Sequence, residues 1–237
     1  MNYSLYSAMT GAQTQQKRMD VIANNLSNLS TTGFKSRQGA FSELIYQNMN
    51  AAEGEDTRLL RGAGARMVKA DSDFSQGVVT PTGMDLDYAI DGDGFFALYD
   101  PLTEEISYTR NGHFSLSEQV DGSFMLVSDT GKWVLNSQGQ PNNMRSAEDD
   151  YDIGVYIFEQ KNGMLNVGQS EFVPVEKNGQ PIVSQDKEGL LQGYLENSNV
   201  DFEREIVHMI ESQRVYQMNL QMVKTTDEVT NTINALR

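Results

Sequence analysis

Four aspartates close together come nearest to a metal-binding pattern in this sequence. They lie at positions 85, 87, 91 and 93 within "DLDYAIDGDGFF". A calcium loop places oxygen ligands at alternating positions and closes with a glutamate. Counted from Asp91 the fifth position is Phe95, and counted from Asp87 the third position is an alanine. The pattern fails in both registers, so we interpret the run as a turn that enters a strand at Phe95–Tyr99. A weak cation site near Asp91 and Asp93 is the minor alternative.

Other groups with catalytic potential are few. The two histidines, His113 and His208, lie in unlike segments, and the chain has no cysteine to complete a metal set with either of them. Paired acids such as Glu104 and Glu105 fall in expected loops, where nothing would desolvate them as acid–base catalysis requires. No nucleophile elbow, phosphate loop or zinc-protease motif is present. We therefore expect no catalytic residue, no cofactor and no metal. A hydrolase that uses acidic loop residues would require a concave site with a perturbed carboxylate.

Composition narrows the classes of partner. The chain has 237 residues, a formal net charge of −15 and no lysine- or arginine-rich run, so we expect no nucleic-acid partner. Acidity of this kind disfavours anionic membrane surfaces, and no apolar run approaches the length of a transmembrane helix, so we expect no membrane insertion. The N-terminal stretch "MNYSLYSAMTGAQTQQKRMD" lacks the apolar core of a secretory signal. If the protein leaves the cell, we expect a dedicated exporter and no cleaved signal peptide.

The first segment is predicted to be a long amphipathic helix that presents an apolar seam. The seam residues recur at alternating steps of four and three, with one polar break, at Leu5, Met9, Ala12, Gln16, Met19, Ala23 and Leu26. A seam carried over three heptads is typical of a helix that pairs with another helix. The stretch "LSTTGF" predicts how this helix ends. Gly33 takes the left-handed position after the last turn, and Leu29 and Phe34 touch in a Schellman cap.

Three asparagines, Asn24, Asn25 and Asn28, stand near the end of this helix, although asparagine is a poor helix former. In one interpretation their amides hydrogen-bond across a helix interface and fix its register. In the other they are solvated residues in a fraying last turn. Spacing alone favours the second interpretation.

The last segment is predicted to be a second long helix. Ser198–Asn199 offers an N-cap, and acidic residues follow in the first turn. One apolar stripe at helical spacing comprises Phe202, Ile206, Met209, Gln213, Tyr216, Leu220 and Val223. A second stripe on an adjoining face comprises Val215, Met218, Met222, Val229, Ile233 and Leu236. The helix would run about 35 residues, or roughly 52 Å. Two wide apolar faces need more than one partner.

The chain between the two helices has a different pattern. Residues 34–49 are expected to hold a short second helix with Phe41, Leu44, Ile45 and Met49 inward, and residues 50–65 are expected to be a connector. From residue 66 onward, short β runs alternate with turn signals, namely "FFALYD", "ISYT", "FSLS", "SFMLVS", "KWVL", "IGVYIFE" and "EFVPVE". We therefore predict an α+β fold. Residues 1–49 with 198–237 form a discontinuous helical assembly domain, in which the helices pair in a coiled-coil-like arrangement, and residues 66–197 form an inserted, mainly antiparallel β domain.

The apolar seams predict how the protein associates. The terminal helices can pair with each other and leave the extra face of the C-terminal helix for neighbouring copies. Head-to-tail contacts that do not close produce a helical filament or tube. The residues expected in this assembly interface are Leu5, Met9, Met19, Ile22, Asn24, Asn25, Leu26, Asn28, Ile206, Met209, Tyr216, Leu220 and Val223. The alternative from another class is a coiled-coil scaffold or adhesin whose β domain binds a ligand.

Five segments of the chain, in order, resemble the axial proteins of the bacterial flagellum, specifically the rod and hook family. They are "MDVIANNLSNLSTTGFK" (19–35), "AIDGDGFFAL" (89–98), "YTRNGHFSL" (108–116), "QGYLENSNVD" (192–201) and "MIESQRVYQMNLQMVKTTDEV" (209–229). The first and last are highly specific. The length of the chain favours the rod over the hook. The stretches "FSELIYQ", "GAGARMV" and "FSQGVV" are most similar to distal rod members, with proximal rod members next.

The resemblance implies a structural subunit of the flagellar basal body, located in the periplasm or across the cell wall. It implies a homopolymer with both terminal helices in a coiled inner tube. Its partners would be other flagellar rod and hook subunits. Export would use the flagellar type III apparatus, without a cleaved signal peptide. The resemblance also favours the interface role for the three asparagines, which match the family signature residue by residue.

Overall fold

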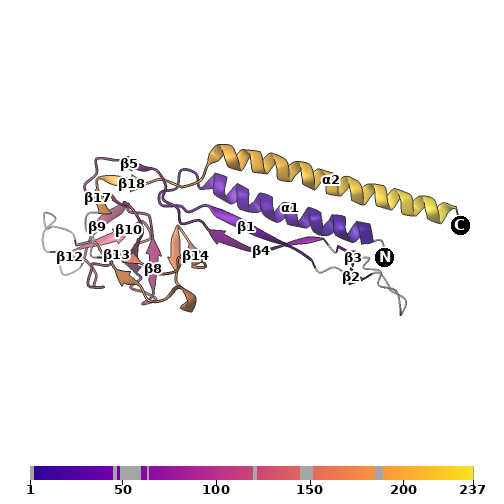
Figure 1. Ribbon diagram of the computed structural model, residues 1–237. Helices are drawn as coiled ribbons and strands as arrows, with labels where there is room; N and C mark the ends of the chain where they lie inside the picture. The colour runs from indigo at the N-terminus through magenta and orange to yellow at the C-terminus, as the bar shows by residue number, and fades with distance from the viewer. Residues whose placement is uncertain are drawn as a thin grey trace. The chain divides into compact units, whose positions relative to one another are not determined.

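The computed structural model describes residues 3–44, 47–48, 60–62, 64–119, 122–144, 152–184 and 189–236. Its fold is α+β, with long helices near both ends of the chain and antiparallel strands between them, as the sequence predicts (Figure 1). The chain forms two compact units. The helical unit comprises Met1–Ser27, Arg37–Asp71 and Asp201–Arg237, and the β unit comprises Asn28–Ser36 and Ser72–Val200.

The helical unit contains both long helices, α1 (Tyr3–Ser27) and α2 (Phe202–Ala235). The length of about 35 residues predicted for the C-terminal helix is confirmed, because α2 has 34 residues. Glu203 and Glu205 stand in its first turn, where the free backbone amides favour negative charge.

The residue that caps α2 is Asp201. Its carboxylate accepts a hydrogen bond from the backbone amide of Arg204 at 3.1 Å. The cap predicted at Ser198–Asn199 is therefore wrong. The Asn199 side chain is used elsewhere, because its Oδ1 accepts from the Ser36 amide at 2.7 Å and its Nδ2 donates to the Asp73 carbonyl at 2.8 Å.

Short strand pairs complete the helical unit. β1 (Arg37–Glu43) pairs with β4 (Ala65–Ser72), and β2 (Gln47–Asn48) pairs with β3 (Leu60–Arg61). The short helix predicted for residues 34–49 is therefore wrong where the structure describes them.

A tertiary contact explains the strand at β1. The side chain of Asn25 bonds to both the backbone N–H and the backbone C=O of Arg37, at 2.9 and 3.0 Å, and so holds the chain extended there. Phe41 is 41% exposed on the strand, and Leu44 is half-buried. Of the other residues predicted to point inward, Ile45 and Met49 lie outside the described residues, as do 50–59 and 63 of the expected connector.

The end of α1 also differs from the prediction. A Schellman cap built from Leu29, Gly33 and Phe34 needs the amide of Phe34 to reach the carbonyl of Leu29. Instead α1 ends at Ser27, and the Phe34 amide donates to the Thr31 carbonyl at 3.3 Å. Gly33 does adopt the predicted left-handed backbone, with φ of 64°, and an added Cβ would lie 2.4 Å from the Asn111 nitrogen. Its role lies within the β unit rather than in capping the helix.

The β unit holds the other strands. They are β5 (Val79–Pro81), β6 (Tyr88–Ile90), β7 (Phe95–Tyr99), β8 (Ile106–Thr109), β9 (Phe114–Glu118), β10 (Phe124–Ser128), β11 (Trp133–Val134), β12 (Asn143–Met144), β13 (Val155–Ile157), β14 (Leu165–Gly168), β15 (Glu171–Val173), β16 (Ile182–Val183), β17 (Leu190–Gln192) and β18 (Tyr194–Glu196), with a 3₁₀ turn η1 (Glu176–Asn178). All seven runs predicted as strands form strands (β7, β8, β9, β10, β11, β13 and β15), so this prediction is confirmed.

Among the described residues, ten of these strands form one antiparallel sheet. Its main path is β12-β10-β11-β7-β8-β15-β14, with β9 against β10, β13 against β7 and β16 against β13. Two further pairs join the last part of the unit to its first part, β17 with β6 and β18 with β5. The segment just before α2 is therefore built into the start of the β unit.

The core of the β unit is organised around β7. Phe96 and Leu98 belong to one buried cluster, and Phe95 and Ala97 belong to a second. Both faces of this strand are covered, which is why its sequence is apolar without alternation. The strand predicted at Phe95–Tyr99 is confirmed, and residues 91–94 turn into it. The turn predicted for the earlier part of "DLDYAIDGDG" is wrong, because Tyr88–Ile90 forms β6.

Candidate assembly surface

The two helices of the helical unit lie side by side and antiparallel (Figure 1). Three close approaches set their register: Asn25 Nδ2 with Glu205 Oε1 (2.9 Å), Arg18 Nη2 with His208 Nδ1 (3.5 Å), and Gly11, where an added Cβ would lie 3.0 Å from Asn219 Nδ2. These groups are polar or small. On the same helices Ile22 is buried and Ile206 and Tyr216 are half-buried, whereas other large apolar side chains of α2 are exposed.

α1 also contacts the strand pair of the helical unit. Thr14 is buried, and its hydroxyl donates to the Ala65 carbonyl at the start of β4 at 2.8 Å. Asn25 is 1% exposed and joins α1 to both β1 and α2. Small apolar residues, Ala8 and Ala12, are buried on the same helix. α1 is therefore covered on more than one side within its own unit.

α2, in contrast to α1, is mostly exposed. Of its described residues, only Ser212 is buried. Its exposed large apolar side chains are Phe202, Val207, Ile210, Val215, Met218, Leu220, Met222, Val229 and Ile233, and Leu236 at its C-cap is exposed as well. Because large exposed apolar patches indicate sites of association, the surface of α2 is the candidate assembly surface.

Part of this surface has the spacing of a helix-pairing seam. Val215, Met218, Met222, Val229 and Leu236 follow one another at steps of three, four, seven and seven residues, and we call them the outer seam. They are between 40% and 84% exposed. They match the second stripe predicted from the sequence, and Ile233 lies beside them on the same helix.

The far end of α2 extends beyond the described part of α1 (Figure 1). Gly11 meets Asn219, so in an antiparallel pair Tyr3, eight residues earlier, falls opposite about residue 227. Beyond that point Val229 and Ile233 are each 58% exposed. The last two turns of α2 are therefore the most open part of the candidate surface.

The residues predicted for the assembly interface fall into three groups. Ile22 and Asn25 are buried. The half-buried members are Leu5, Met19, Leu26, Asn28, Ile206, Met209, Tyr216 and Val223. Met9, Asn24 and Leu220 are exposed. Asn28 belongs to the β unit, as do the predicted cap residues Leu29, Gly33 and Phe34, of which the last two are buried.

A buried charge cluster, which the sequence analysis missed, lies within the β unit. Lys35, Arg110 and Glu196 are each 1–2% exposed, and we call them the Glu196 cluster. Glu196 Oε1 accepts from Lys35 Nζ at 2.6 Å and from the Gly77 amide at 2.8 Å, and Oε2 accepts from Arg110 Nη1 at 3.1 Å. Burial lowers the pKa of the Lys35 ammonium, and the Glu196 carboxylate opposes that shift. One carboxylate therefore serves two buried cations.

Backbone carbonyls accept from two further donors of the cluster, whereas Arg110 Nε is buried with no acceptor among the described residues. Lys35 Nζ donates to the Ser75 carbonyl at 2.7 Å, and Arg110 Nη2 donates to the Gly92 carbonyl at 2.6 Å. Lys35, Gly92, Arg110 and Glu196 come from four of the five signature segments quoted above. Each segment thus contributes one charge or one turn to a shared site. Spacing along the chain cannot show this, because the partners lie up to 161 residues apart and the segments also carry other charges, such as Asp20, Asp91 and Asp201.

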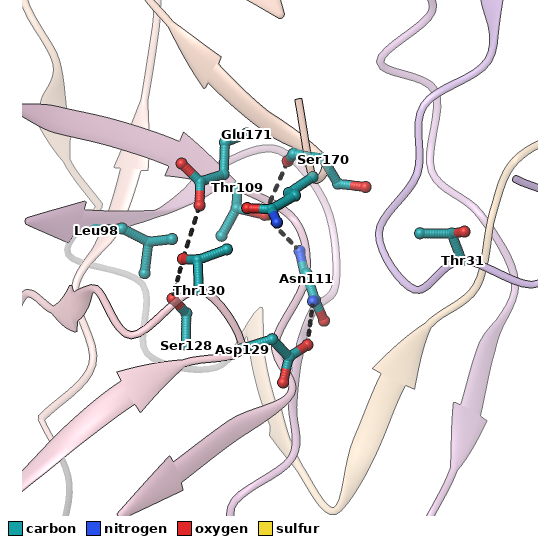
Figure 2. A pocket seen from close by; sticks show the side chains of 10 residues that line it. Thr31, Leu98, Thr109, Asn111, Ser128, Asp129, Thr130, Ser170 and Glu171 are labelled. Atoms are coloured by element: carbon teal, nitrogen blue, oxygen red, sulfur yellow. Dashed lines mark hydrogen bonds between the residues drawn. The ribbon is translucent and has the colours of Figure 1, made fainter. Parts of the chain in front are cut away.

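A polar pocket also lies in the β unit (Figure 2). Its walls carry Thr31, Leu98, Thr109, Asn111, Ser128, Asp129, Thr130, Gln169, Ser170 and Glu171. Its carboxylates are bonded to neighbours, because Glu171 accepts from Thr130 at 2.9 Å and from Lys132 at 2.6 Å, and Asp129 accepts from Asn111 at 3.1 Å. These hydrogen bonds connect residues at the ends of β8, β10 and β15, so they stabilise the sheet there.

Within the described ranges, no three histidine or acidic side chains gather as a bound metal ion would require. No helix in that part of the chain is long and apolar enough to cross a bilayer.

Antiparallel terminal helices with an open apolar seam, attached to a β unit with internally paired charges, define an α+β subunit suited to association. Comparison with known proteins identifies its relatives. The chain is 33% identical to "Flagellar basal-body rod protein FlgG" of Buchnera aphidicola subsp. Baizongia pistaciae, with 98% of this chain and 99% of the relative covered. It is 32% identical to the protein of that name in Borreliella burgdorferi (100% and 99% covered) and 30% identical to that in Bacillus subtilis (95% and 96% covered).

The chain therefore belongs to the flagellar basal-body rod protein family, a family of structural subunits. Three family descriptions match along it. Residues 5–35 match "Flagella basal body rod protein", residues 89–155 match "Flagellar hook protein FlgE/F/G D1 domain", and residues 191–236 match "Flagellar basal body rod FlgEFG protein C-terminal". The resemblance inferred from the sequence is confirmed, including its distal rod relatives.

Proposed function

We propose that this protein is a structural subunit of the flagellar basal-body rod, which polymerises through its terminal helices into a hollow axial tube. The tube transmits torque and passes exported subunits. The observation that carries the proposal is the outer seam of α2, which is exposed on a helix with a single buried residue among those described. Family membership and the names of the FlgG relatives support the rod assignment.

The proposed mechanism of assembly follows from a difference in burial, since α1 is covered within its own unit and α2 is mostly exposed. α1 and α2 pair in a coiled-coil-like arrangement within one subunit, and the outer seam then packs against helices of neighbouring copies. Each large apolar side chain buried in such a contact contributes about 1.5–3 kcal/mol. A head-to-tail contact that does not close generates a helical tube rather than a small ring.

The sequence predicts an assembly domain from residues 1–49 with 198–237 and a β domain from residues 66–197. In this proposal the compact helical unit takes the first role and the β unit, which includes Asn28–Ser36 and Ser72–Val200, lies outside the tube. The interface residues are those predicted from the sequence, with the outer seam added. Neighbours along the axis include other rod and hook subunits. The subunit reaches the periplasm or cell wall through the flagellar type III export apparatus, without a cleaved signal peptide.

The scaffold or adhesin alternative has less support. The relatives reported above are named as rod proteins. The polar pocket of the β unit has its carboxylates engaged in bonds with Thr130, Lys132 and Asn111, so they are not free to serve an adhesin or a hydrolase there.

The test compares two triple variants in a strain whose own copy of the gene is deleted. Val229→Ser, Ile233→Ser and Leu236→Ser remove apolar side chains that are 58%, 58% and 84% exposed on the last turns of α2 and its C-cap. The matched control, Val78→Ser, Leu102→Ser and Ile182→Ser, removes side chains that are 69%, 92% and 64% exposed on the β unit.

We expect the α2 variant to be exported but to give no rod in isolated basal bodies and no swimming. The control variant should assemble and swim. Normal rods in the α2 variant would refute the proposed role of the helix surface.

A further inference from the structure

The last segment of the β unit, Gly189–Val200, supplies partners to groups that come much earlier in the chain. Glu196 is 161 residues after Lys35 and 86 residues after Arg110. Its own backbone carbonyl accepts from the Gly33 amide at 2.8 Å. The same segment adds β17 to β6 and β18 to β5. The β unit is therefore closed by its final twelve residues.

Without that segment, the earlier part of the unit cannot bury its cations favourably. Lys35 would keep the Ser75 carbonyl, and Arg110 would keep the Gly92 carbonyl. Asp73 also attracts Lys35, but more weakly than Glu196 does. Carbonyl groups solvate a charge without neutralising it. Burying two like charges with no opposite charge between them is strongly unfavourable.

We propose that the Glu196 cluster delays folding of the β unit until Gly189–Val200 is present. Before that point Lys35 and Arg110 favour solvent, and the sheet around β7 stays open. Once Glu196 arrives, one carboxylate accepts from both cations and the Gly77 amide, and the core closes cooperatively. The charge cluster therefore determines when the β unit closes during folding of this chain.

Timing of this kind matters for a chain that appears with its N-terminus first. A ribosome releases residues 28–36 and 72–128 well before residue 196, so the β unit would remain unfolded through most of synthesis. The same order would hold on exit from an export channel. This consequence rests on the proposed function, whereas the order of folding itself does not depend on it.

The experiment follows refolding of the full chain from urea by pulsed hydrogen exchange with mass spectrometry. It compares protection of the backbone amides in β7–β10 with protection in Gly189–Val200. The test variant is Lys35→Met, Arg110→Met and Glu196→Gln, which removes all three charges while the side-chain carbonyl introduced at position 196 can still accept from the Gly77 amide. The control is Glu171→Gln. Glu171 is another buried carboxylate, and its partners Ser107, Thr130 and Lys132 lie in the middle of the chain.

In the wild-type chain, β7–β10 and Gly189–Val200 should gain protection in the same kinetic phase. In the triple variant, β7–β10 should gain protection at least tenfold faster than Gly189–Val200. Glu171→Gln should keep the wild-type order. Glu196→Gln alone should keep that order and lower the folding equilibrium constant by a factor of about 100 or more.

Two results would overturn the proposal. One is a wild-type chain in which β7–β10 is protected in an earlier phase than Gly189–Val200, and this result is decisive even if the triple variant does not fold. The other is a triple variant that keeps the wild-type order, because strand pairing alone would then account for the delay. Because purified protein is used, the outcome is independent of whether the chain builds a rod.

Discussion

Removal of the Glu196 carboxylate is expected to destabilise the β unit severely. In Glu196→Ala, Lys35 and Arg110 remain in an environment where they are 1% and 2% exposed, with backbone carbonyls as their remaining acceptors. Breaking a buried ion pair costs about 3–5 kcal/mol. The amide of Gly77 also loses its acceptor, which adds about 1–3 kcal/mol. We therefore expect the free energy of unfolding to fall by at least about 4 kcal/mol, out of a typical total of about 5–15 kcal/mol.

The chain carries its own probe for this measurement. Trp133 is its single tryptophan, and it lies on β11 with its ring 5.9 Å from that of Tyr99. Its fluorescence during urea unfolding at pH 7 reports on the unit that contains Glu196. The matched control is Glu176→Ala, the same substitution at an exposed position of the same unit. The control should change the free energy of unfolding by less than about 0.5 kcal/mol.

A double-mutant cycle separates the cost of leaving the Lys35 charge unpaired from other destabilising effects of Glu196→Ala. Lys35→Met is introduced alone and together with Glu196→Ala. Once the carboxylate is gone, removing the ammonium relieves an unpaired charge, so the two changes should couple by at least about 2 kcal/mol. A loss below about 1 kcal/mol for Glu196→Ala, or strict additivity of the two changes, would refute the role of Glu196 as the counter-charge of the two buried cations.

Three further perturbations test other parts of the structure. Asn25→Ala removes the side chain that bonds to both β1 and α2, so the free energy of unfolding of the helical unit, measured by far-UV circular dichroism, should fall by about 1–3 kcal/mol; an unchanged melting curve contradicts this. Gly112→Ala places a Cβ 1.6 Å from the Tyr88 carbonyl oxygen and should cost about 3 kcal/mol, whereas Ser115→Ala at an exposed position of β9 should be neutral. Burial raises the pKa of Tyr108 to about 12, so its contribution to stability is complete below the unfolded value near 10 and is lost as the pH rises from 10 to 12. Relative to Tyr108→Phe, the wild-type protein should lose about 2 kcal/mol over that interval in urea unfolding, and parallel pH profiles for the two proteins would refute the shift.

Patterns with a strong local period predicted the architecture well. The continuous apolar run of β7 and the turn signals around it identify a buried strand and its neighbours, because short strands bounded by glycine and aspartate leave few alternatives. The long C-terminal helix was predicted equally well, since no glycine or proline interrupts it between Gly193 and its end. In these elements local propensity and tertiary packing favour the same state.

The failures occur where a distant residue decides the local structure. The strand β1 was predicted as a helix because the spacing of Phe41 and Leu44 fits a helix. The two backbone bonds from Asn25 override that preference. Asp201 rather than Asn199 caps α2, because Asn199 already bonds to Ser36 and Asp73. In each case a polar side chain had two chemically reasonable uses, and only the fold selects between them.

The three asparagines illustrate the same limit at single-residue scale. Asn25 is 1% exposed, whereas Asn24 is exposed and Asn28 is half-buried in the β unit. They are chemically identical and nearly adjacent, and a helix turns by about 100° per residue, so one position lies against neighbouring elements while the next faces solvent. The sequence identifies the three asparagines as candidates, but it does not show that Asn25 is the one that joins α1 to β1 and α2.

The contact between α1 and α2 leaves large apolar side chains of α2 exposed. Where α1 meets α2, the residues that approach most closely include Gly11 and the polar pair Asn25 and Glu205. Such contacts fix the register of the pair. The large side chains of α2 are left for another surface, so the free subunit keeps Met218 and Val229 about three-fifths exposed. Covering apolar side chains at this spacing with a second helix is favourable, which is the physical basis of the proposed assembly.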